Sequence, residues 1–205
     1  MTSRGAERRV VPNEVVVAER TLRPWIIRGE RTLLSCPPFL DVSAHTVELP
    51  DGRLVDDFYQ IAMPDYTCIF PELEDGRLLL LRSYRHGPRR ICLTFPGGQV
   101  AGGEAPLDGA KRELLEETGL ISDDWRSLGS FVTQANQRCQ TAHLFRATHC
   151  RSVRLPESGD LEEQELVPMS RADALRAFRR GDFAILEHAA LLALATSAEL
   201  GPARD

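Results

Sequence analysis

The sequence predicts an α+β fold, and three features indicate it. Short β-type runs dominate the first hundred residues and recur over residues 125–132 and 142–147. A helix rich in Ala, Leu, Lys, Arg and Glu, all strong helix formers, separates these two groups of strands. Two further helices are expected near the C-terminal end, over residues 170–180 and 184–198. Strands and helices segregated along the chain in this way are typical of an α+β domain.

The composition is that of an ordinary globular protein. Its 205 residues are 42% hydrophobic and 27% charged, enough for one domain or one domain with a small appendage. The net charge of −5 argues against a general nucleic-acid-binding or anionic-membrane-binding surface. The sequence has no membrane-spanning apolar run, no secretory signal and no CxxC pair among its five cysteines. We therefore expect a cytoplasmic protein with reduced thiols.

Turn signals and composition divide the chain into three parts. Residues 1–12 are expected to form a flexible tail. Residues 13–62 hold several β-type runs, two of them joined by the turn signal Leu49-Pro50-Asp51-Gly52. This β-rich subdomain is too small for a core of its own, so we expect it to act as a dimer arm. Residues 63–205 are expected to form the main domain, and the protein to be a homodimer.

A basic cluster follows the second strand of the main domain. That strand, Arg77–Leu81, is almost entirely leucine, which predicts burial on both faces of a sheet. Residues 82–90 then contain four arginines and a histidine. Because arginine forks match phosphate oxygens, Arg82 and Arg85 are candidate substrate contacts. A solvated loop tip is the alternative, and it is most plausible for Arg89 and Arg90.

The stretch from Gly98 to Leu120 carries the densest group of candidate catalytic residues. Pro106 suits the first turn of a helix and Gly119 the left-handed residue that ends one. At about 100° per residue, the glutamates of this helix share one arc at the rim between core and solvent. They are Glu113, Glu116 and Glu117.

These glutamates predict a metal site. Like charges one turn apart destabilise a helix slightly and call for a cation. Arg112 can pair with Glu116 at i, i+4, which leaves Glu113 and Glu117 to hold a hard divalent ion. Mg2+ is the natural candidate, with Mn2+ as its substitute, because Mg2+ binds through one or two carboxylates plus substrate phosphates. The alternative is a solvated amphipathic helix laced with salt bridges.

Nine positions of this stretch resemble the signature of the Nudix hydrolase superfamily without a mismatch. They are Gly98, Glu104, Arg112-Glu113-Leu114, Glu116-Glu117 and Gly119-Leu120. The resemblance implies an α/β/α sandwich with a mixed β-sheet between helices. It also implies that Glu113 and Glu117 are metal ligands, that Glu116 is a ligand or the partner of Arg112, and that the Gly97 carbonyl completes the site. Glu104 would orient the helix carboxylates.

Within the superfamily, residues 30–195 are most similar to the ADP-ribose and sugar-nucleotide pyrophosphatases. Ser83-Tyr84-Arg85 resembles a Gln-Tyr-Arg segment of that group, and Phe95-Pro96-Gly97-Gly98 its turn before the helix. The likeness implies that Arg85 contacts the pyrophosphate or terminal ribose and that Gly98 approaches the substrate. Glu162 or Glu163 would be the general base or an extra ligand. Trp25 is a candidate for stacking on a base, against the alternative of a buried structural tryptophan.

The expected reaction is Mg2+-dependent hydrolysis of the pyrophosphate bond of a nucleoside diphosphate-sugar. ADP-ribose is favoured, with AMP and ribose 5-phosphate as products. Two departures from the group weaken the case for ADP-ribose itself: Thr94 stands near the place of a glutamate, and Ala135-Asn136-Gln137 contains no proline. The alternatives are a Nudix hydrolase for coenzyme A, a GDP-sugar or a nucleoside triphosphate, and a non-catalytic nucleotide sensor.

Overall fold

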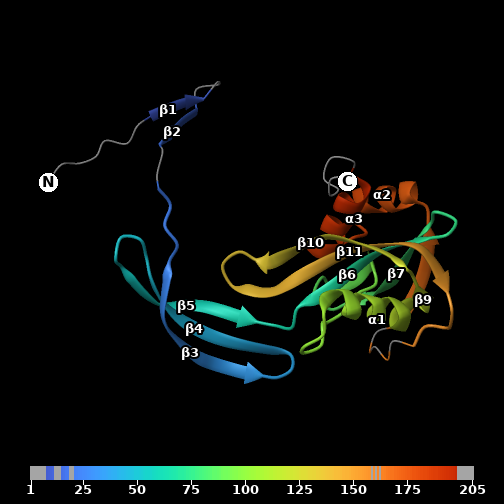
Figure 1. The fold of residues 1–205 in the computed structure, drawn as a ribbon, viewed down its shortest axis with the longest axis horizontal. Helices are drawn as coiled ribbons and strands as arrows, with labels where there is room; N and C mark the ends of the chain where they lie inside the picture. Colours follow the sequence, from blue (N-terminus) through green and yellow to red (C-terminus); the bar gives the residue numbers. More distant parts are fainter. Residues whose placement is uncertain are drawn as a thin grey trace. The chain divides into compact units, whose positions relative to one another are not determined.

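The structure is a computed structural model that describes residues 8–11, 15–18, 21–157, 159, 161 and 163–197. The chain divides into two compact units. One consists of Met1–Leu33 and Ser43–Tyr59, and the other of Leu34–Val42 and Gln60–Asp205. Figure 1 labels the elements of both. Among the described helices, none is long and apolar enough to cross a membrane.

The first unit is built from strands alone in its described part. Most residues of β3 (Ile26–Cys36), β4 (Leu40–Glu48) and β5 (Leu54–Ala62) belong to this unit, and the three strands are successive neighbours in a sheet. The predicted turn joins β4 to β5: the Gly52 N–H donates to the Leu49 carbonyl, 2.9 Å away. Part of the segment expected as a tail instead forms β1 (Arg8–Val11), which pairs antiparallel with β2 (Val15–Ala18). Both runs contain consecutive valines, which favour extended backbone.

A mixed sheet forms the centre of the second unit, as the sequence predicted. The long strand β11 (Arg138–Ser152) runs parallel to β6 (Tyr66–Leu73) and antiparallel to β10 (Asp124–Gln134). The strand β7 (Leu78–Arg85) lies next to β6 and pairs antiparallel with β8 (Arg90–Thr94) and β12 (Gln164–Met169). The short β9 (Leu120–Ile121) pairs with β11. Because β7 continues to residue 85, Arg82 and Arg85 lie on a strand, and not in the loop tip of the alternative interpretation.

Helices cover both faces of this sheet (Figure 1). Alternate residues of a strand point to opposite faces. Accordingly Leu78 and Leu80 share one cluster with residues of α2 (Arg171–Arg179) and α3 (Leu186–Thr196). Leu79 shares the other with residues of α1 (Pro106–Thr118). The predicted sandwich and the two-sided burial of β7 are therefore confirmed.

The ends of α1 and α2 are those that the sequence predicted. Pro106 opens α1, and Gly119 ends it in the left-handed region, at φ 69°. The Ser170 hydroxyl caps α2 by accepting a hydrogen bond from the Asp173 N–H, at 3.1 Å. Pro106 and Gly119 fix where α1 begins and ends, and so they fix which of its side chains face the loop that precedes it.

Candidate active site

The glycine loop after β8 is in direct contact with β6 and α1. A Cβ atom on Gly97 would lie 2.1 Å from the Thr67 carbonyl oxygen, so no larger residue fits there. The Gly97 N–H donates to the Glu117 carboxylate at 2.7 Å, and the Gly98 carbonyl accepts from the Thr67 N–H at 2.8 Å. A Cβ on Gly98 would lie 2.4 Å from the Glu113 carboxyl carbon. The two glycines thus let the loop lie against two glutamates of α1.

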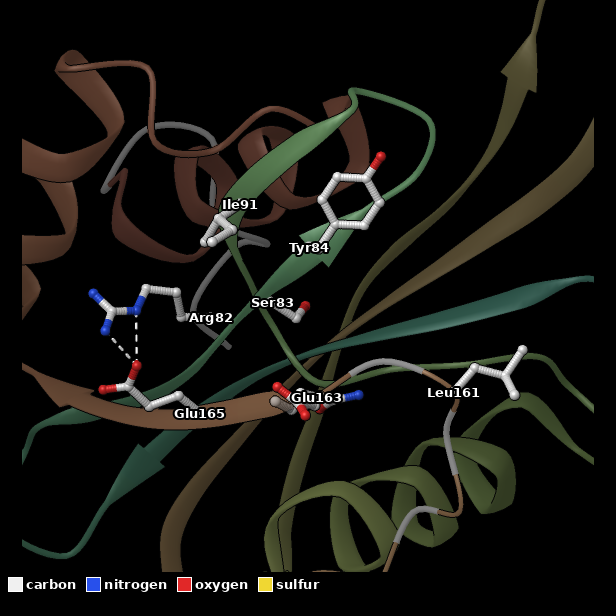
Figure 2. A pocket seen from close by; sticks show the side chains of 8 residues that line it. Arg82, Ser83, Tyr84, Ile91, Leu161, Glu163 and Glu165 are labelled. Carbon is white, nitrogen blue, oxygen red and sulfur yellow. Dashed lines mark hydrogen bonds and ion pairs between the residues drawn. The ribbon is translucent and has the colours of Figure 1, made fainter.

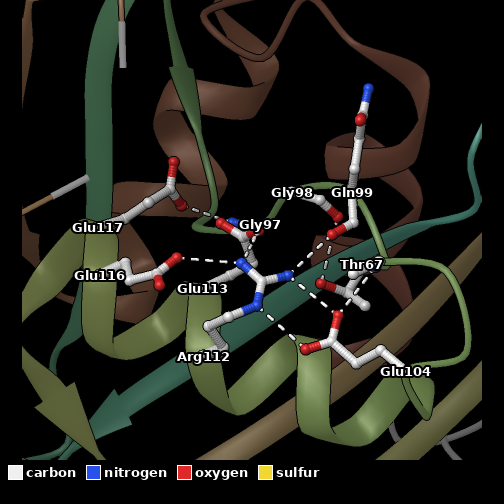
Figure 3. A network of polar contacts seen from close by, with 10 residues as sticks. Thr67, Gly97, Gly98, Gln99, Glu104, Arg112, Glu113, Glu116 and Glu117 are labelled. Carbon is white, nitrogen blue, oxygen red and sulfur yellow. Dashed lines mark hydrogen bonds and ion pairs between the residues drawn. The ribbon is translucent and has the colours of Figure 1, made fainter. Parts of the chain in front are cut away.

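Arg112 is the centre of the polar network beside this loop (Figure 3). Its Nε donates to Glu104 Oε1 at 3.0 Å, and its Nη2 donates to Glu104 Oε2 at 3.1 Å and to the Gln99 carbonyl at 2.9 Å. Its Nη1 donates to Glu116 at 3.0 Å, as predicted, and also to Glu113 at 2.6 Å. The contact of Arg112 with Glu113 was not predicted, and the role of Glu113 as a metal ligand stays a prediction. The five-donor guanidinium fork can serve three carboxylates at once, which i, i+4 spacing does not reveal.

The contact between Glu104 and Arg112 favours the charged form of each. Hydrogen bonds from Arg112 are the main reason that the pKa of Glu104 lies below its ordinary value. In return, Glu104 foremost raises the pKa of the Arg112 guanidinium. Glu104 therefore orients Arg112, and through it Glu113 and Glu116.

The donor set of this site fits a hard divalent cation. Three carboxylates, those of Glu104, Glu113 and Glu116, bind a single guanidinium. A fourth, that of Glu117, is only 6% exposed and accepts from the Gly97 N–H. Oxygen donors with excess negative charge are the ligands that Mg2+ takes. Within the part of the chain that the structure describes, no three acidic, histidine or cysteine side chains already form a ready metal cluster. Arg112 lies among the carboxylates instead.

A hollow of about 900 Å³ opens beside the network. Its lining includes Gln99, Gly102, Glu104, Arg112 and Glu113. A second hollow of about 250 Å³ is lined by Arg85 together with Tyr66, Gln140, Glu187 and His188, among others. Arg85, at the end of β7, is thus positioned at the wall of a cavity, where a substrate could reach it.

Other candidates from the sequence lie elsewhere. Arg82 forms an ion pair with Glu165, so its charge is already partnered. Glu163 lines a cavity of β7, β8 and β12 (Figure 2), while Glu162 lies outside the described residues. Trp25 belongs to the first unit, where it is 51% exposed and stacks edge-on against Phe58. It is therefore not the buried tryptophan of the alternative interpretation.

Sequence reasoning missed His188, which supports the glycine loop from α3. The ring is buried, and its Nδ1 accepts a hydrogen bond from the Phe95 N–H at 3.0 Å and lies 3.2 Å from Cys68 Sγ. Burial lowers the pKa of His188 to about 3, so the ring is neutral. The available signal was one histidine within the apolar run Leu186–Thr196.

Comparisons with known proteins agree with this arrangement. The sequence matches the NUDIX domain over residues 64–189. It is 28% identical over 140 residues to an ADP-ribose pyrophosphatase of Bacillus subtilis (strain 168), covering 67% of this chain and 74% of that protein. It is 30% identical over 152 residues to a CMP-5'-(N-acetyl-N-hydroxy-3-aminopropyl)phosphonate hydrolase of Streptomyces rubellomurinus, covering 74% of this chain and 73% of that protein. The fold is similar to a crystal structure titled as an ADP compounds hydrolase, with a TM-score of 0.73, 21% identity, and coverage of 85% of this chain and 93% of that one.

Proposed function

The chain belongs to the NUDIX family and is a hydrolase of that family, and from this premise we propose that it cleaves the pyrophosphate bond of a nucleoside diphosphate-sugar. ADP-ribose is the favoured substrate, with AMP and ribose 5-phosphate as products. The observation that carries the proposal is the Arg112-centred carboxylate network beside the Gly97–Gly98 loop. The ADP-ribose and ADP-sugar pyrophosphatases among its relatives support this substrate class.

Enzymes of this family typically use a divalent metal, and we propose Mg2+ for this chain, with Mn2+ as its substitute. Glu113, Glu116 and Glu117 would hold the ion together with the Gly97 carbonyl. When bound, Mg2+ supplies charge neutralisation of the diphosphate and lowers the pKa of coordinated water. Glu113 would then exchange part of its contact with Arg112 for the ion.

The remaining steps fall to side chains of the protein. Arg85 would donate to the phosphate oxygens that are not attacked, where a guanidinium fork stabilises developing charge. Glu163 would accept a proton from the attacking water, with Glu162 as the other candidate for that role. Arg112 would keep the glutamates of α1 oriented without contacting substrate.

The first unit is proposed as a dimer arm of a homodimer. Its described residues expose several large apolar side chains, including Ile27 and Leu54. Exposed apolar surface of this kind is typical of protein–protein contacts. Trp25 would offer its half-exposed ring to a nucleobase there.

A substrate panel tests the proposal. Purified protein with Mg2+ would be given ADP-ribose, ADP-glucose, CDP- and GDP-sugars, coenzyme A and nucleoside triphosphates, and the products identified by 31P NMR. CDP-linked compounds are included because one relative is named as a CMP-phosphonate hydrolase. We expect a nucleoside monophosphate and a sugar phosphate in equal amounts, with the highest kcat/KM for ADP-ribose. Turnover of triphosphates or coenzyme A alone would overturn the substrate class.

A further inference from the structure

The glycine loop, residues 95–98, is held by β6 on one side and by α1 on another. From β6, the Thr67 N–H donates to the Gly98 carbonyl at 2.8 Å. The Ile69 N–H donates to the Pro96 carbonyl at 2.9 Å. From α1, a glutamate carboxylate accepts the N–H of the first glycine (Figure 3). These contacts leave the N–H of the first residue of the loop to be satisfied from elsewhere.

That first residue, Phe95, follows directly on β8, which ends at Thr94. Its N–H therefore lies beyond the ladder of the strand, while the residue is only 1% exposed. A buried N–H without an acceptor is costly, so a partner is needed. The partner is His188 Nδ1 on α3, which accepts the hydrogen bond at 3.0 Å. The loop is thus held on a third side by a side chain from a distant part of the sequence.

This hydrogen bond determines which nitrogen of the ring carries the proton. An imidazole nitrogen that accepts has no proton of its own, so the neutral His188 ring has its proton on Nε2. A doubly protonated ring would turn an N–H toward the Phe95 N–H and break the contact. Burial, with the positive charge of Arg85 as a second cause, lowers the pKa of His188 to about 3. The acceptor is therefore present at neutral pH.

Cys68 and Phe95 fix the orientation of the His188 ring. Cys68 Sγ lies 3.2 Å from the same Nδ1. Burial raises the pKa of the Cys68 thiol, so the group stays protonated beside the accepting nitrogen. On another side the rings of His188 and Phe95 stack, with centroids 6.4 Å apart and 24° between their planes. With contacts on two sides and 4% exposure, the ring has one available orientation.

The loop transmits the position of Phe95 to the groups proposed to bind metal. Pro96 has a fixed φ, which removes one degree of freedom between them. Gly97 packs so closely that a Cβ atom there would lie 2.1 Å from the Thr67 carbonyl oxygen. The Gly97 N–H in turn donates to Glu117 at 2.7 Å. A displacement of the Phe95 backbone would therefore move Gly97 and its hydrogen bond to Glu117 as well.

We propose that His188 positions the metal site by accepting the hydrogen bond from the Phe95 N–H. The bond keeps the Gly97 carbonyl and the Glu117 carboxylate in the geometry that binds the ion. The inference rests on the proposed function, which places the ion at these two groups. His188 acts on the ion only through the loop, and small displacements of such groups are enough to weaken binding and catalysis.

Metal binding by three variants tests this role. EPR would measure free Mn2+ during titration of the substrate-free protein, and the Tm would be measured on the same samples. His188→Leu removes the acceptor and should weaken Mn2+ binding about tenfold, the effect of one lost hydrogen bond in a buried site. His188→Asn, whose amide oxygen can replace Nδ1, should bind Mn2+ within about threefold of the wild type. Leu191→Ala, in the core on the same helix, should lower the Tm but keep Mn2+ affinity within about twofold.

An NMR measurement on the wild type does not depend on how any variant folds. The 15N shifts of the His188 ring should show a proton on Nε2 and none on Nδ1 from pH 5 to pH 8. A proton on Nδ1 within this range would overturn the proposal, because Nδ1 could not then accept from the Phe95 N–H.

The outcomes separate this role from the proposed function. If His188→Leu binds Mn2+ like the wild type, or if Leu191→Ala weakens binding as much as His188→Leu, the positioning role is overturned. A folded His188→Asn that binds Mn2+ as weakly as His188→Leu would overturn it too. If the variants behave as expected but the wild type hydrolyses no nucleoside diphosphate-sugar, the positioning role stands and the proposed function fails. If the wild type binds no Mn2+, both fail.

Discussion

Polar groups lie on the α1 side of the sheet in two regions, the stretch from Glu104 to Glu117 and the strand pair β7–β8. Those of the first region have hydrogen-bond partners, and two hydroxyls of the second lack them within the described part of the chain. Around Arg112, hydrogen bonds of 2.6 to 3.1 Å tie three carboxylates to one guanidinium. On the strands, Ser83 and Thr94 are buried hydroxyls without partners among the described residues.

The contrast separates charged groups from neutral ones. A charged group cannot be buried without a partner, so the protein must supply Arg112 before any ligand arrives. A neutral hydroxyl costs much less to leave unpaired. The Arg112 network is thus preorganised before any ligand binds, whereas the two hydroxyls on the strands are left without partners among the described residues.

The largest effect is expected from removing one charge of the network while keeping its shape. Glu117→Gln should lower kcat by on the order of 10³-fold, because the amide cannot serve as an anionic ligand or base. The fold should survive, since the side-chain oxygen can still accept from the Gly97 N–H. Steady-state kinetics with ADP-ribose and circular dichroism would measure both. The control is Glu74→Gln, on an exposed turn, which should keep wild-type turnover. Wild-type turnover in Glu117→Gln would contradict the catalytic role of Glu117.

Removing the cation of the network should cost both activity and stability. Arg112→Ala leaves Glu104, Glu113 and Glu116 without their shared donor, and we expect the free energy of unfolding to fall by about 2 kcal/mol. Arg112→Lys should recover part of the loss, because it restores charge without the fork. Urea unfolding of the three proteins would measure this. If the alanine variant were as stable as the wild type, the hydrogen bonds of Arg112 would contribute nothing to the free energy of unfolding.

The pH dependence of the free energy of unfolding should distinguish the contribution of the charged network from that of the buried neutral ring of His188. The pKa of His188 falls from 6.5 to about 3 on folding, so the unfolded state binds more protons between these values. Stability should therefore fall on acidification below pH 6.5, by about 1.4 kcal/mol per pH unit from this group. Glu104, whose pKa is lowered, instead loses its contribution only below its ordinary value of 4.5.

Urea unfolding at pH 7, 6 and 5 separates these contributions. The wild type should lose stability from pH 6 to pH 5, and His188→Gln should show a smaller slope whatever its absolute stability. An identical slope in the two proteins would mean that His188 does not stay neutral in the folded state.

The smallest expected effect compares a partnered hydroxyl with an unpartnered one. Ser170 caps α2 by accepting from the Asp173 N–H, so Ser170→Ala should destabilise the protein by about 1 kcal/mol. Because α2 packs on the other face of the sheet, kcat should not change. Ser83→Ala, in contrast, should not destabilise the protein. If Ser83→Ala lowered the Tm as much as Ser170→Ala, the Ser83 hydroxyl would contribute to stability like a partnered one, and the comparison would fail.

The α1 site was predictable from sequence to the extent that its geometry is local. Pro106, Gly119 and the spacing of the glutamates fix a helix and the face that its carboxylates share. The contact of Arg112 with Glu113 was missed because residues adjacent in sequence point in different directions on a helix. Only the length and flexibility of the two side chains bring them together.

By itself, the sequence determined the family, the mixed sheet between helices and the set of acidic residues at the site. The helix and its acidic face follow from caps and one-turn spacings, which depend on neighbours along the chain. The family and the mixed sheet followed instead from the resemblance of nine positions to the Nudix signature. Tertiary structure alone decided that Gly97 holds Glu117, that His188 supports Phe95 from 93 residues away, and that Ser83 lines a cavity. Such contacts depend on which strands pair and in which register, and no local pattern encodes whether a buried hydroxyl finds a partner.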